Sequence, residues 1–573
     1  MLLKKLFKRE KISDKLSKEV TFADLTVLGL IILIGVIVSW GSGSNKQPAQ
    51  QAKAAYPINF SQTPVAELPA AKDNQVVELK NGDTYNLTAS IVKRMVGNTE
   101  VKALAYNGSV PGPTIKVAQG AEIIINFTNN TDVPNTIHSH GVRLDNAFDG
   151  LPDITQPAVA VGQSFTYKIK FPDAGVFWYH PHIREDYAQP LGLYGMFLVA
   201  PTEANYWSPV NQEWPVFVSD VLMQNNQLAA FDSQAADHTL MGRYGNILLV
   251  NGNTNTQFQA KQGEVVRMYI ANAATARPFN LTIPGVKMKL VGGDNGKYEQ
   301  EQWADSVTLG PSERAIVEVM FDRSGAFILE NKTPQQETPL ATINVLTQQV
   351  AISYKTQFET LRANKDVATS IDPFRQYFDK PIDKNLVLTL DMKGMMGNSS
   401  GTHQMPNGQM MSNGSGGMQS MHMMGGNMAM DNNSMSMGND TDPIEWDDTM
   451  GMMNANSTTN TLQWKLVDKD TGKANDQIDW QFKKGDVVKI SIYNDPNSMH
   501  PMQHPIHFHG NRFLVLSTNG VKNTDLVWKD TVLIPKGATV ELLADMSNPG
   551  IWMAHCHIAE HLESGMMMKF EVE

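Results

Sequence analysis

Three segments of the chain share one alternation of apolar and polar residues. They read GAEIIINFTN at residues 120–129, GEVVRMYIAN at residues 263–272 and GDVVKISIYN at residues 485–494, and they align without a gap. In each segment, β-branched residues alternate with other residues between a glycine and an asparagine. This pattern is typical of a half-buried β-strand. The chain is therefore predicted to contain three copies of one β-rich unit.

Two further signatures follow each predicted strand at similar distances. The first comprises TIHSHG at residues 136–141, NLTIPG at 280–285 and PIHFHG at 505–510. The second comprises GVFWYHPH at residues 175–182, GAFILEN at 325–331 and GIWMAHCH at 550–557. We predict an all-β fold of three Greek-key β-sandwich domains. The first and third copies carry histidines at matching positions, and the middle copy carries none there.

The repeat spacing sets the predicted domain boundaries. With 573 residues, the chain is long enough for about three or four domains of roughly 100–200 residues each. The three domains are predicted at residues 75–204, 205–360 and 380–573. An insertion at residues 392–453 lengthens the third domain and holds more than half of the 32 methionines. Its glycine, serine and asparagine residues show no strand or helix period, so we expect a loop.

The N-terminus has the residue order of a membrane anchor. Residues 1–24 form a basic segment, residues 25–40 are apolar, and residues 41–74 read as a linker. As a helix, the apolar run would rise about 24 Å, which is short of the roughly 30 Å hydrocarbon core of a bilayer. We expect an uncleaved transmembrane anchor, with the basic segment in the cytoplasm and the three domains on the extracytoplasmic side of the cell membrane. The alternative is a secreted or periplasmic protein after cleavage of a signal peptide.

The composition excludes several classes of protein. The chain has 47 basic and 58 acidic side chains and a formal net charge of −11, so it lacks the basic excess with which a nucleic-acid-binding protein neutralises phosphates. Its one cysteine, Cys556, excludes an intramolecular disulfide and a cysteine-rich zinc site. The sequence indicates no particular oligomeric state.

Ten of the fourteen histidines lie in four short motifs. The motifs are HSH (His138, His140), HPH (His180, His182), HPIHFH (His504, His507, His509) and HCHIAEH (His555, His557, His561). A lone buried histidine is usually structural, but packing does not explain paired histidines at matching positions of two repeats. Residues i and i+2 of a strand point to the same face, so each His-x-His pair can reach one metal cluster.

Cys556 lies between two of these histidines. In a strand, the flanking imidazoles would point to one face and the thiolate to the other, so that Cys556 could bind a separate metal joined to the cluster by two peptide units. His504, His561 and Met566 complete a set of two histidines, one cysteine and a weak thioether, which is the ligand set of a blue-copper site. The motif thus predicts a short electron conduit. The alternative, a buried structural thiol, does not account for the flanking histidines.

With these motifs in place, the chain resembles the multicopper oxidases of the three-domain, laccase-like type. The resemblance covers residues 75–573, and all four motifs occur with the family's spacing. It implies cupredoxin-like domains and about four coppers per chain. It places a type 1 copper on His504, Cys556, His561 and Met566, a type 2 copper on His138 and His507, and a type 3 pair on His140, His180, His182, His509, His555 and His557. The trinuclear cluster would lie between the first and third domains, with the middle domain acting as a spacer.

The resemblance also implies the reaction. A reductant would lose one electron at a time at the type 1 copper, and four such steps would reduce O2 to two waters at the trinuclear cluster. Asp149 in LDNAFDG matches the acid that often supplies protons in the family; as an alternative, Asp149 and Gly150 form a turn. Bacterial relatives often carry a carboxylate directly after the type 1 histidine, where this chain has Leu562. Glu563, or else Glu560, is the expected substitute.

The methionine-rich insertion bears on the identity of the reductant. Thioethers are soft ligands that favour Cu(I), and in copper-resistance oxidases of the family a similar insertion near the type 1 site marks cuprous oxidase activity. We therefore expect Cu(I) as a reductant and a role in copper tolerance. One alternative is a laccase that oxidises small aromatic reductants, namely phenols and aromatic amines, with the insertion as an adaptable surface loop. The other is a non-catalytic copper-buffering protein, which the complete set of ligands disfavours.

Overall fold

The three repeated segments form equivalent strands in the computed structural model of the protein. They correspond to β5 (Glu122–Asn130), β15 (Val265–Asn272) and β28 (Asp486–Asn494). The glycine that opens each segment has a φ of 83°, 88° and 91°, a conformation that other residues adopt only with strain. Each of these strands pairs in parallel with one neighbour and antiparallel with the other. The predicted β-rich repeat is therefore confirmed.

The structure describes residues 56–393, 403–404, 410–411 and 442–573. The predicted basic segment and anchor, and most of the methionine-rich insertion, lie outside these residues. Within them, no helix has the length and apolar character needed to cross a membrane. Part of the predicted linker is described, and it packs on the first sandwich: Ile58 is buried, and Ala70 forms a β-bridge with Lys93.

Two sheets with orders β3-β2-β5-β7 and β1-β4-β9-β8-β6 form the first sandwich. One buried core joins them, with Ile125 and Tyr167 from the first sheet and Phe177 and Phe197 from the second. The elements are η1 (Val65–Glu67), β1 (Val76–Glu78), β2 (Thr84–Val96), β3 (Thr99–Tyr106), β4 (Thr114–Ala118), β6 (His138–His140), η2 (Asn146–Phe148), β7 (Ser164–Lys170), β8 (Gly175–His180), α2 (Glu185–Ala188) and β9 (Gly195–Ala200).

The second sandwich has sheet orders β13-β10-β15-β20-β17-β18 and β14-β22-β21-β16-β19. Val216 and Ile270 of the first sheet and Leu281 and Ile343 of the second share its core. The elements are β10 (Gln212–Val221), β11 (Met223–Gln224), β12 (Gln227–Leu228), β13 (Ile247–Val250), β14 (Thr256–Gln262), β16 (Phe279–Thr282), β17 (Met288–Gly293), β18 (Gly296–Ala304), β19 (Val307–Leu309), β20 (Arg314–Met320), β21 (Gly325–Lys332) and β22 (Glu337–Gln349).

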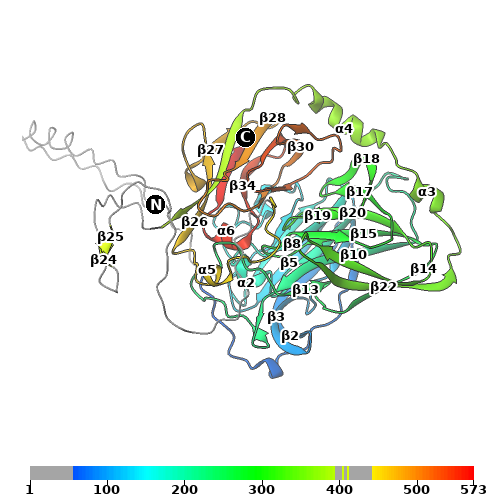
Figure 1. Ribbon diagram of the computed structural model, residues 1–573, viewed down its shortest axis with the longest axis horizontal. Helices are drawn as coiled ribbons and strands as arrows, with labels where there is room; N and C mark the ends of the chain where they lie inside the picture. Colours follow the sequence, from blue (N-terminus) through cyan, green and yellow to red (C-terminus); the bar gives the residue numbers. More distant parts are fainter. Residues whose placement is uncertain (1–55, 394–402, 405–409, 412–441) are drawn as a thin grey trace, which may run out of the picture. The chain divides into compact units, whose positions relative to one another are not determined.

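The third sandwich repeats this topology, with orders β26-β23-β28-β33-β30-β31 and β27-β35-β34-β29-β32. The elements are α3 (Lys355–Glu359), α4 (Lys365–Arg375), β23 (Lys384–Met392), β24 (His403–Gln404), β25 (Met410–Met411), α5 (Gly451–Ala455), β26 (Leu462–Asp468), η3 (Asn475–Gln477), β27 (Asp479–Phe482), β29 (His504–Phe508), β30 (Arg512–Thr518), β31 (Val521–Lys522), β32 (Thr531–Ile534), β33 (Thr539–Met546), β34 (Gly550–Cys556), α6 (Ala559–Glu563) and β35 (Met567–Val572). Figure 1 shows the three sandwiches coloured from blue through green to red.

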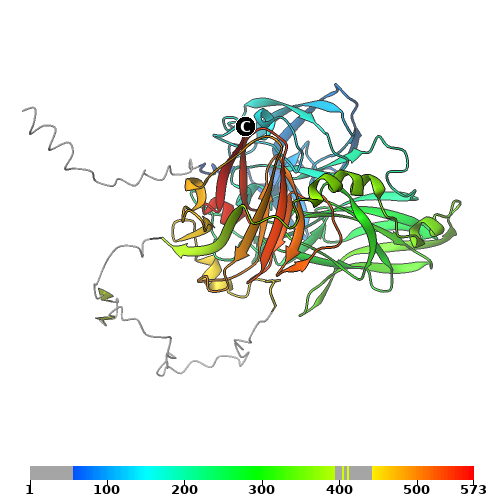
Figure 2. The same cartoon turned by 90° about the horizontal axis from the view of Figure 1, so that it is seen from above.

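Helix α4 joins the second and third sandwiches, as Figure 2 shows. Its residues Val367 and Ile371 are buried against Leu514, Leu543 and neighbouring apolar side chains of the third sandwich. Lys297 of β18 forms an ion pair with Asp366 of the helix at 2.9 Å. The second and third sandwiches are thus packed together by contacts on both sides of this helix.

The pairing of strands explains why the histidine motifs meet. β6 pairs antiparallel with β8, which places His138 opposite His180. β29 pairs antiparallel with β34, which places His507 opposite His555. The equivalent strands of the middle repeat, β16 and β21, pair in the same way but carry no histidine at these positions.

Candidate metal centre

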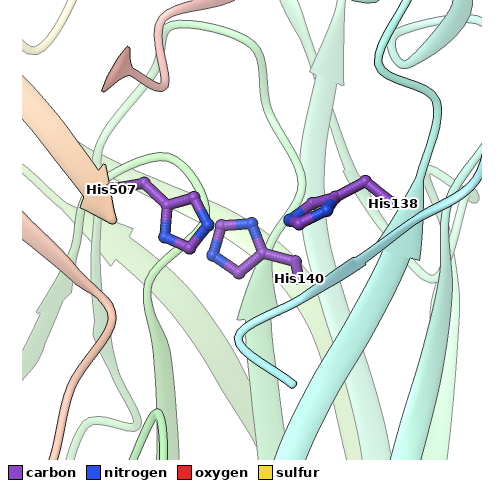
Figure 3. Close-up of side chains that lie close together, drawn as sticks. All are labelled: His138, His140 and His507. Carbon is purple, nitrogen blue, oxygen red and sulfur yellow. The ribbon is translucent and has the colours of Figure 1, made fainter. Parts of the chain in front are cut away.

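Eight histidines from the first and third sandwiches gather in one buried cluster. The rings of His140 and His507, from different sandwiches, stack with centroids 3.8 Å apart. Those of His138 and His509 lie 4.1 Å apart. Figure 3 shows His138, His140 and His507 converging from β6 and β29. Three groups in the cluster have ring nitrogens within 4.8 Å of one another: His138, His140 and His507; His140, His180 and His557; and His182, His509 and His555.

Several ring nitrogens in the cluster have no hydrogen-bond partner among the residues that the structure describes. They are Nε2 of His138, His180 and His507, Nδ1 of His140 and both nitrogens of His557. In three of these rings, the other nitrogen is held by a backbone carbonyl at 2.8 Å, that of Asp149, Pro181 or Asp530. Buried polar atoms are rarely left unsatisfied, and a ring fixed by one nitrogen is oriented to bind a metal through the other. The histidine cluster therefore fits a metal centre.

Burial favours the neutral form of several of these imidazoles. Removal from water is the largest effect, and it lowers the pKa of His140, His180, His509 and His557 well below the ordinary value. Neighbouring histidines lower the pKa of each ring further. Because only the neutral imidazole has a lone pair free for a metal, the site holds its ligands in the binding form.

A second group lies on the other side of β34. The Cys556 sulfur lies 3.6 Å from Nδ1 of His504 and 3.8 Å from Nδ1 of His561, and the two nitrogens lie 3.3 Å apart. All three side chains are fully buried. Met566 belongs to the same core, and its carbonyl accepts a hydrogen bond from the Cys556 N–H at 3.1 Å. Trp464 closes the group by stacking on His561 at 4.3 Å. This set matches the donors of a blue-copper site.

Burial also raises the pKa of the Cys556 thiol well above its ordinary value. The thiol is therefore protonated until a metal binds, and metal binding must displace the proton. The flanking histidines belong to the cluster, since His555 is grouped with His182 and His557 with His180. Two peptide units thus join the two metal-binding groups.

The three predicted acids lie in different surroundings in the structure. Asp149 is fully buried against the cluster, with Oδ2 at 2.9 Å from Nδ1 of His509. Glu563 lies at the end of α6, where it interacts electrostatically with Arg184 and Asp186. Glu560 is fully buried, and burial raises the pKa of its carboxyl well above the ordinary value. Asp149 thus has its carboxylate bonded to a cluster histidine.

Sequence reasoning missed two acids that contact the cluster. Glu185 in α2 has Oε1 at 3.3 Å from Nδ1 of His182 and Oε2 at 3.9 Å from Nδ1 of His180. Its position three residues after His182 was an available signal. Asp530 has Oδ1 at 3.0 Å from Nε2 of His140. It lies far from every histidine motif in the chain, so no local pattern pointed to it.

Comparison with known proteins gives a consistent family description. Three family models, each described as multicopper oxidase, match residues 88–204, 212–351 and 439–573. The multicopper oxidase mco of Staphylococcus haemolyticus is 25% identical over 496 residues, covering 84% of this chain and 88% of its own. The multicopper oxidase MmcO of Mycobacterium tuberculosis is 25% identical over 526 residues, covering 85% and 86%. Laccase-1 of Botryotinia fuckeliana is 25% identical over 485 residues, covering 82% and 78%.

Solved structures show the same fold. A multicopper oxidase from Campylobacter jejuni, described as a metallo-oxidase, has a TM-score of 0.61 and 23% identity, covering 90% of this chain and 98% of its own. A laccase-like multicopper oxidase from Ochrobactrum sp. has a TM-score of 0.62 and 19% identity, covering 88% and 100%. The cupredoxin-like architecture is thus shared.

Proposed function

The chain belongs to the multicopper oxidase family, and we propose that it uses Cu(I) as a reductant in copper tolerance. Members of the family are copper oxidoreductases that use O2, and the family implies four coppers per chain. When bound, these coppers supply one-electron oxidation at the type 1 site and reduction of O2 to water at the trinuclear cluster. The proposal specifies the reductant and the biological role.

We assign the ligands from the two buried groups. The type 1 copper is assigned to His504, Cys556, His561 and Met566, the type 2 copper to His138 and His507, and the type 3 pair to His140, His180, His182, His509, His555 and His557. The convergence of these side chains supports the assignment, as do the ring nitrogens of His138, His140, His180, His507 and His557 that have no hydrogen-bond partner within the described part of the chain. The chain's own contribution is a buried site, with Cys556 as the covalent path from one group to the other.

Exposed methionines at the end of the insertion support Cu(I) as the reductant. Helix α5 overlaps the end of the methionine-rich insertion, and its Met452 and Met453 are 84% and 61% exposed, although methionine is usually buried. Asn454 of the same helix accepts a hydrogen bond from the N–H of Met241 at 3.0 Å. The preceding Leu240 forms a backbone hydrogen bond with His561. These contacts link the helix that carries the two soft thioethers to His561 of the type 1 group.

Deleting residues 395–440 tests this proposal. We expect kcat/KM for Cu(I) to fall about tenfold, or ~1.4 kcal/mol of transition-state stabilisation, because the deletion removes most of the thioethers. We expect turnover of dimethoxyphenol to be retained. Oxygen consumption with each reductant measures both values, with copper content and blue absorption as controls for the integrity of the site. If the deletion left the turnover of Cu(I) and the turnover of dimethoxyphenol both unchanged, the proposed role of the insertion would be contradicted.

A laccase is the second candidate. Relatives from Botryotinia fuckeliana and Arabidopsis thaliana are named laccases, and the same type 1 group would accept electrons from phenols and aromatic amines. In the same oxygen-consumption assay, fast phenol turnover together with slow Cu(I) oxidation by the intact chain would favour this candidate.

Asp149 is proposed to supply protons for O2 reduction. Its buried carboxylate bonds to His509, and Oδ1 lies 3.3 Å from Nδ1 of His138. Asp149→Asn keeps the shape but cannot transfer the proton, so we expect O2 turnover to fall about 10²-fold or more. Anaerobic bleaching of the blue colour by the reductant should stay at the wild-type rate. Asp145→Asn, at the exposed cap of η2, is the matched control, and wild-type O2 turnover in Asp149→Asn would leave Asp149 with the role of a turn residue.

We also propose that the enzyme is extracytoplasmic and held at the cell membrane by residues 25–40. The order of basic, apolar and linker residues supports this location. Fractionation of cells with an antibody to the third domain tests it: a full-length chain in the membrane fraction is expected, and a shortened chain in the medium or periplasm would indicate cleavage.

A further inference from the structure

Asp530 and Thr531 hold two cluster histidines that come from different domains. The Asp530 carboxylate bonds to Nε2 of His140 at 3.0 Å, and its carbonyl accepts from Nδ1 of His507 at 2.8 Å. The Thr531 hydroxyl lies 2.9 Å from Nε2 of His140 and 3.1 Å from Nδ1 of His507. Since these two rings stack at 3.8 Å, one dipeptide sets the orientation of both.

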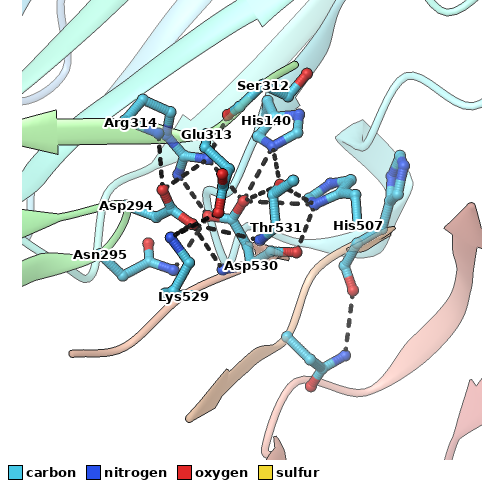
Figure 4. Close-up of polar contacts among 12 residues, drawn as sticks. His140, Asp294, Asn295, Ser312, Glu313, Arg314, His507, Lys529, Asp530 and Thr531 are labelled. Atoms are coloured by element: carbon cyan, nitrogen blue, oxygen red, sulfur yellow. Dashed lines mark hydrogen bonds and ion pairs between the residues drawn. The ribbon is translucent and has the colours of Figure 1, made fainter. Parts of the chain in front are cut away.

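Arg314 of the middle domain holds this dipeptide in place. Its guanidinium forms a bidentate pair with the Asp530 carboxylate, with Nη1 at 2.7 Å from Oδ1 and Nη2 bonded to Oδ2. Nε donates to the carbonyl of Val176 in the first domain at 3.2 Å. Arg314 therefore contacts all three domains, and Figure 4 shows its pair with Asp530. Arg314 is fully buried. Arginine is the amino acid whose side chain offers two parallel donors in one plane.

The middle domain also fixes Arg314 itself. Asp294 accepts the Arg314 N–H at 2.9 Å, and its Oδ2 lies 3.2 Å from Nζ of Lys529, the residue before Asp530. The packing leaves no room for rearrangement, because a Cβ on Gly141 would lie 2.3 Å from Oδ2 of Asp530 and 2.6 Å from Nη2 of Arg314. Gly141 directly follows His140, so the ion pair and the metal-binding strand are in direct contact.

We propose that Arg314 is a positioning residue for the trinuclear cluster, acting through Asp530 on His507, which is assigned to the type 2 copper, and on His140, which is assigned to the type 3 pair. The inference rests on the proposed assignment of these histidines as copper ligands. Partners that orient ligands contribute roughly 10-fold to 100-fold in metal affinity. The middle domain, which supplies no histidine to the cluster, then takes part in the metal centre, beyond the role of a spacer that its sequence suggests.

Arg314→Lys in the full-length, copper-loaded chain tests the proposal. Lysine keeps the positive charge but loses the bidentate geometry. We expect the dissociation constant of the type 2 copper, measured by competition with a chelator, to rise roughly 10-fold or more. The type 2 signal in electron paramagnetic resonance should change, whereas the type 1 signal and the blue absorption should not. Arg267→Lys is the matched control, because Arg267 is a buried arginine of the same domain paired with Glu318, and it should leave the type 2 copper unchanged.

Wild-type type 2 affinity and signal in Arg314→Lys would overturn the proposal. If this variant yields no folded blue protein, Asp530→Asn decides, because it keeps the shape of the side chain but removes the charge that pairs with Arg314. Weaker type 2 binding in Asp530→Asn supports the proposal, and unchanged binding overturns it. A wild-type chain without any type 2 signal would instead refute the copper-ligand assignment itself, so the two failures are distinguishable.

Discussion

Replacing Cys556 by serine is expected to abolish oxidation of every reductant while the trinuclear site stays loaded with copper. Cys556 is the chain's one cysteine, and its thiolate is the strongest donor in the type 1 group. It is also the covalent link between that group and the two flanking cluster histidines. Serine offers neither a thiolate nor the electron path. The blue absorption should disappear, and O2 consumption with Cu(I) or with dimethoxyphenol should fall to the uncatalysed background.

The matched control for this prediction is Met566→Leu. Leucine has nearly the same volume as methionine, and Met566 is the weak axial member of the set, so this variant should keep its blue colour and measurable turnover. Type 2 copper, followed by its paramagnetic resonance signal, should be present in both variants. Sustained O2 consumption by Cys556→Ser would show that electrons reach the cluster by another route, and would refute the assignment of Cys556.

Metal-free protein, prepared with a chelator, is expected to lose stability steeply in acid. Burial lowers the pKa of His504 to about 3, and burial together with neighbouring histidines holds the pKa values of His140, His180 and His509 well below ordinary values. In the unfolded chain these groups bind protons below a pH of about 6.5, whereas in the folded chain they stay neutral. The unfolded state therefore gains protons as the pH falls, and each histidine weakens folding by up to ~1.4 kcal/mol per pH unit.

The pH range over which stability is lost follows from the direction of these pKa shifts. The stabilising contribution of the neutral histidines is complete above a pH of about 6.5 and is lost progressively as the pH falls toward about 3. Glu560 acts in the opposite direction, because its raised pKa favours the folded state in acid. Urea unfolding at several pH values between about 4 and 7.5 measures the slope. Copper-loaded protein is the control and should unfold at higher urea at every pH; a flat profile for the metal-free protein would contradict the burial of neutral imidazoles.

Local patterns in the sequence predicted the strands and the histidine groups. Alternation of period two marked β5, β15 and β28, and the same period placed His555 and His557 on one face with Cys556 on the other. These features depend on residues that are close together in the chain, so they can be recognised in a single sequence.

The residues that support the metal centre did not follow from the sequence. Arg314 and Asp530 meet only because two domains pack together, and 216 residues separate them in the chain. Glu563, which the resemblance suggests as a substitute for the carboxylate absent at Leu562, interacts electrostatically with Arg184 and Asp186. Contacts between domains depend on tertiary packing, which no short motif encodes.

One half of the histidine cluster lies on the paired strands β6 and β8, and the other half lies on the paired strands β29 and β34. The two halves are far apart in the sequence. A metal bound by both halves therefore acts as a cross-link, closing a loop of several hundred residues. Cross-links of this kind disfavour the unfolded ensemble more as the closed loop lengthens. Copper should thus make the three domains unfold as one cooperative unit. The redox cofactor then also serves as a cross-link between residues that are distant in the sequence.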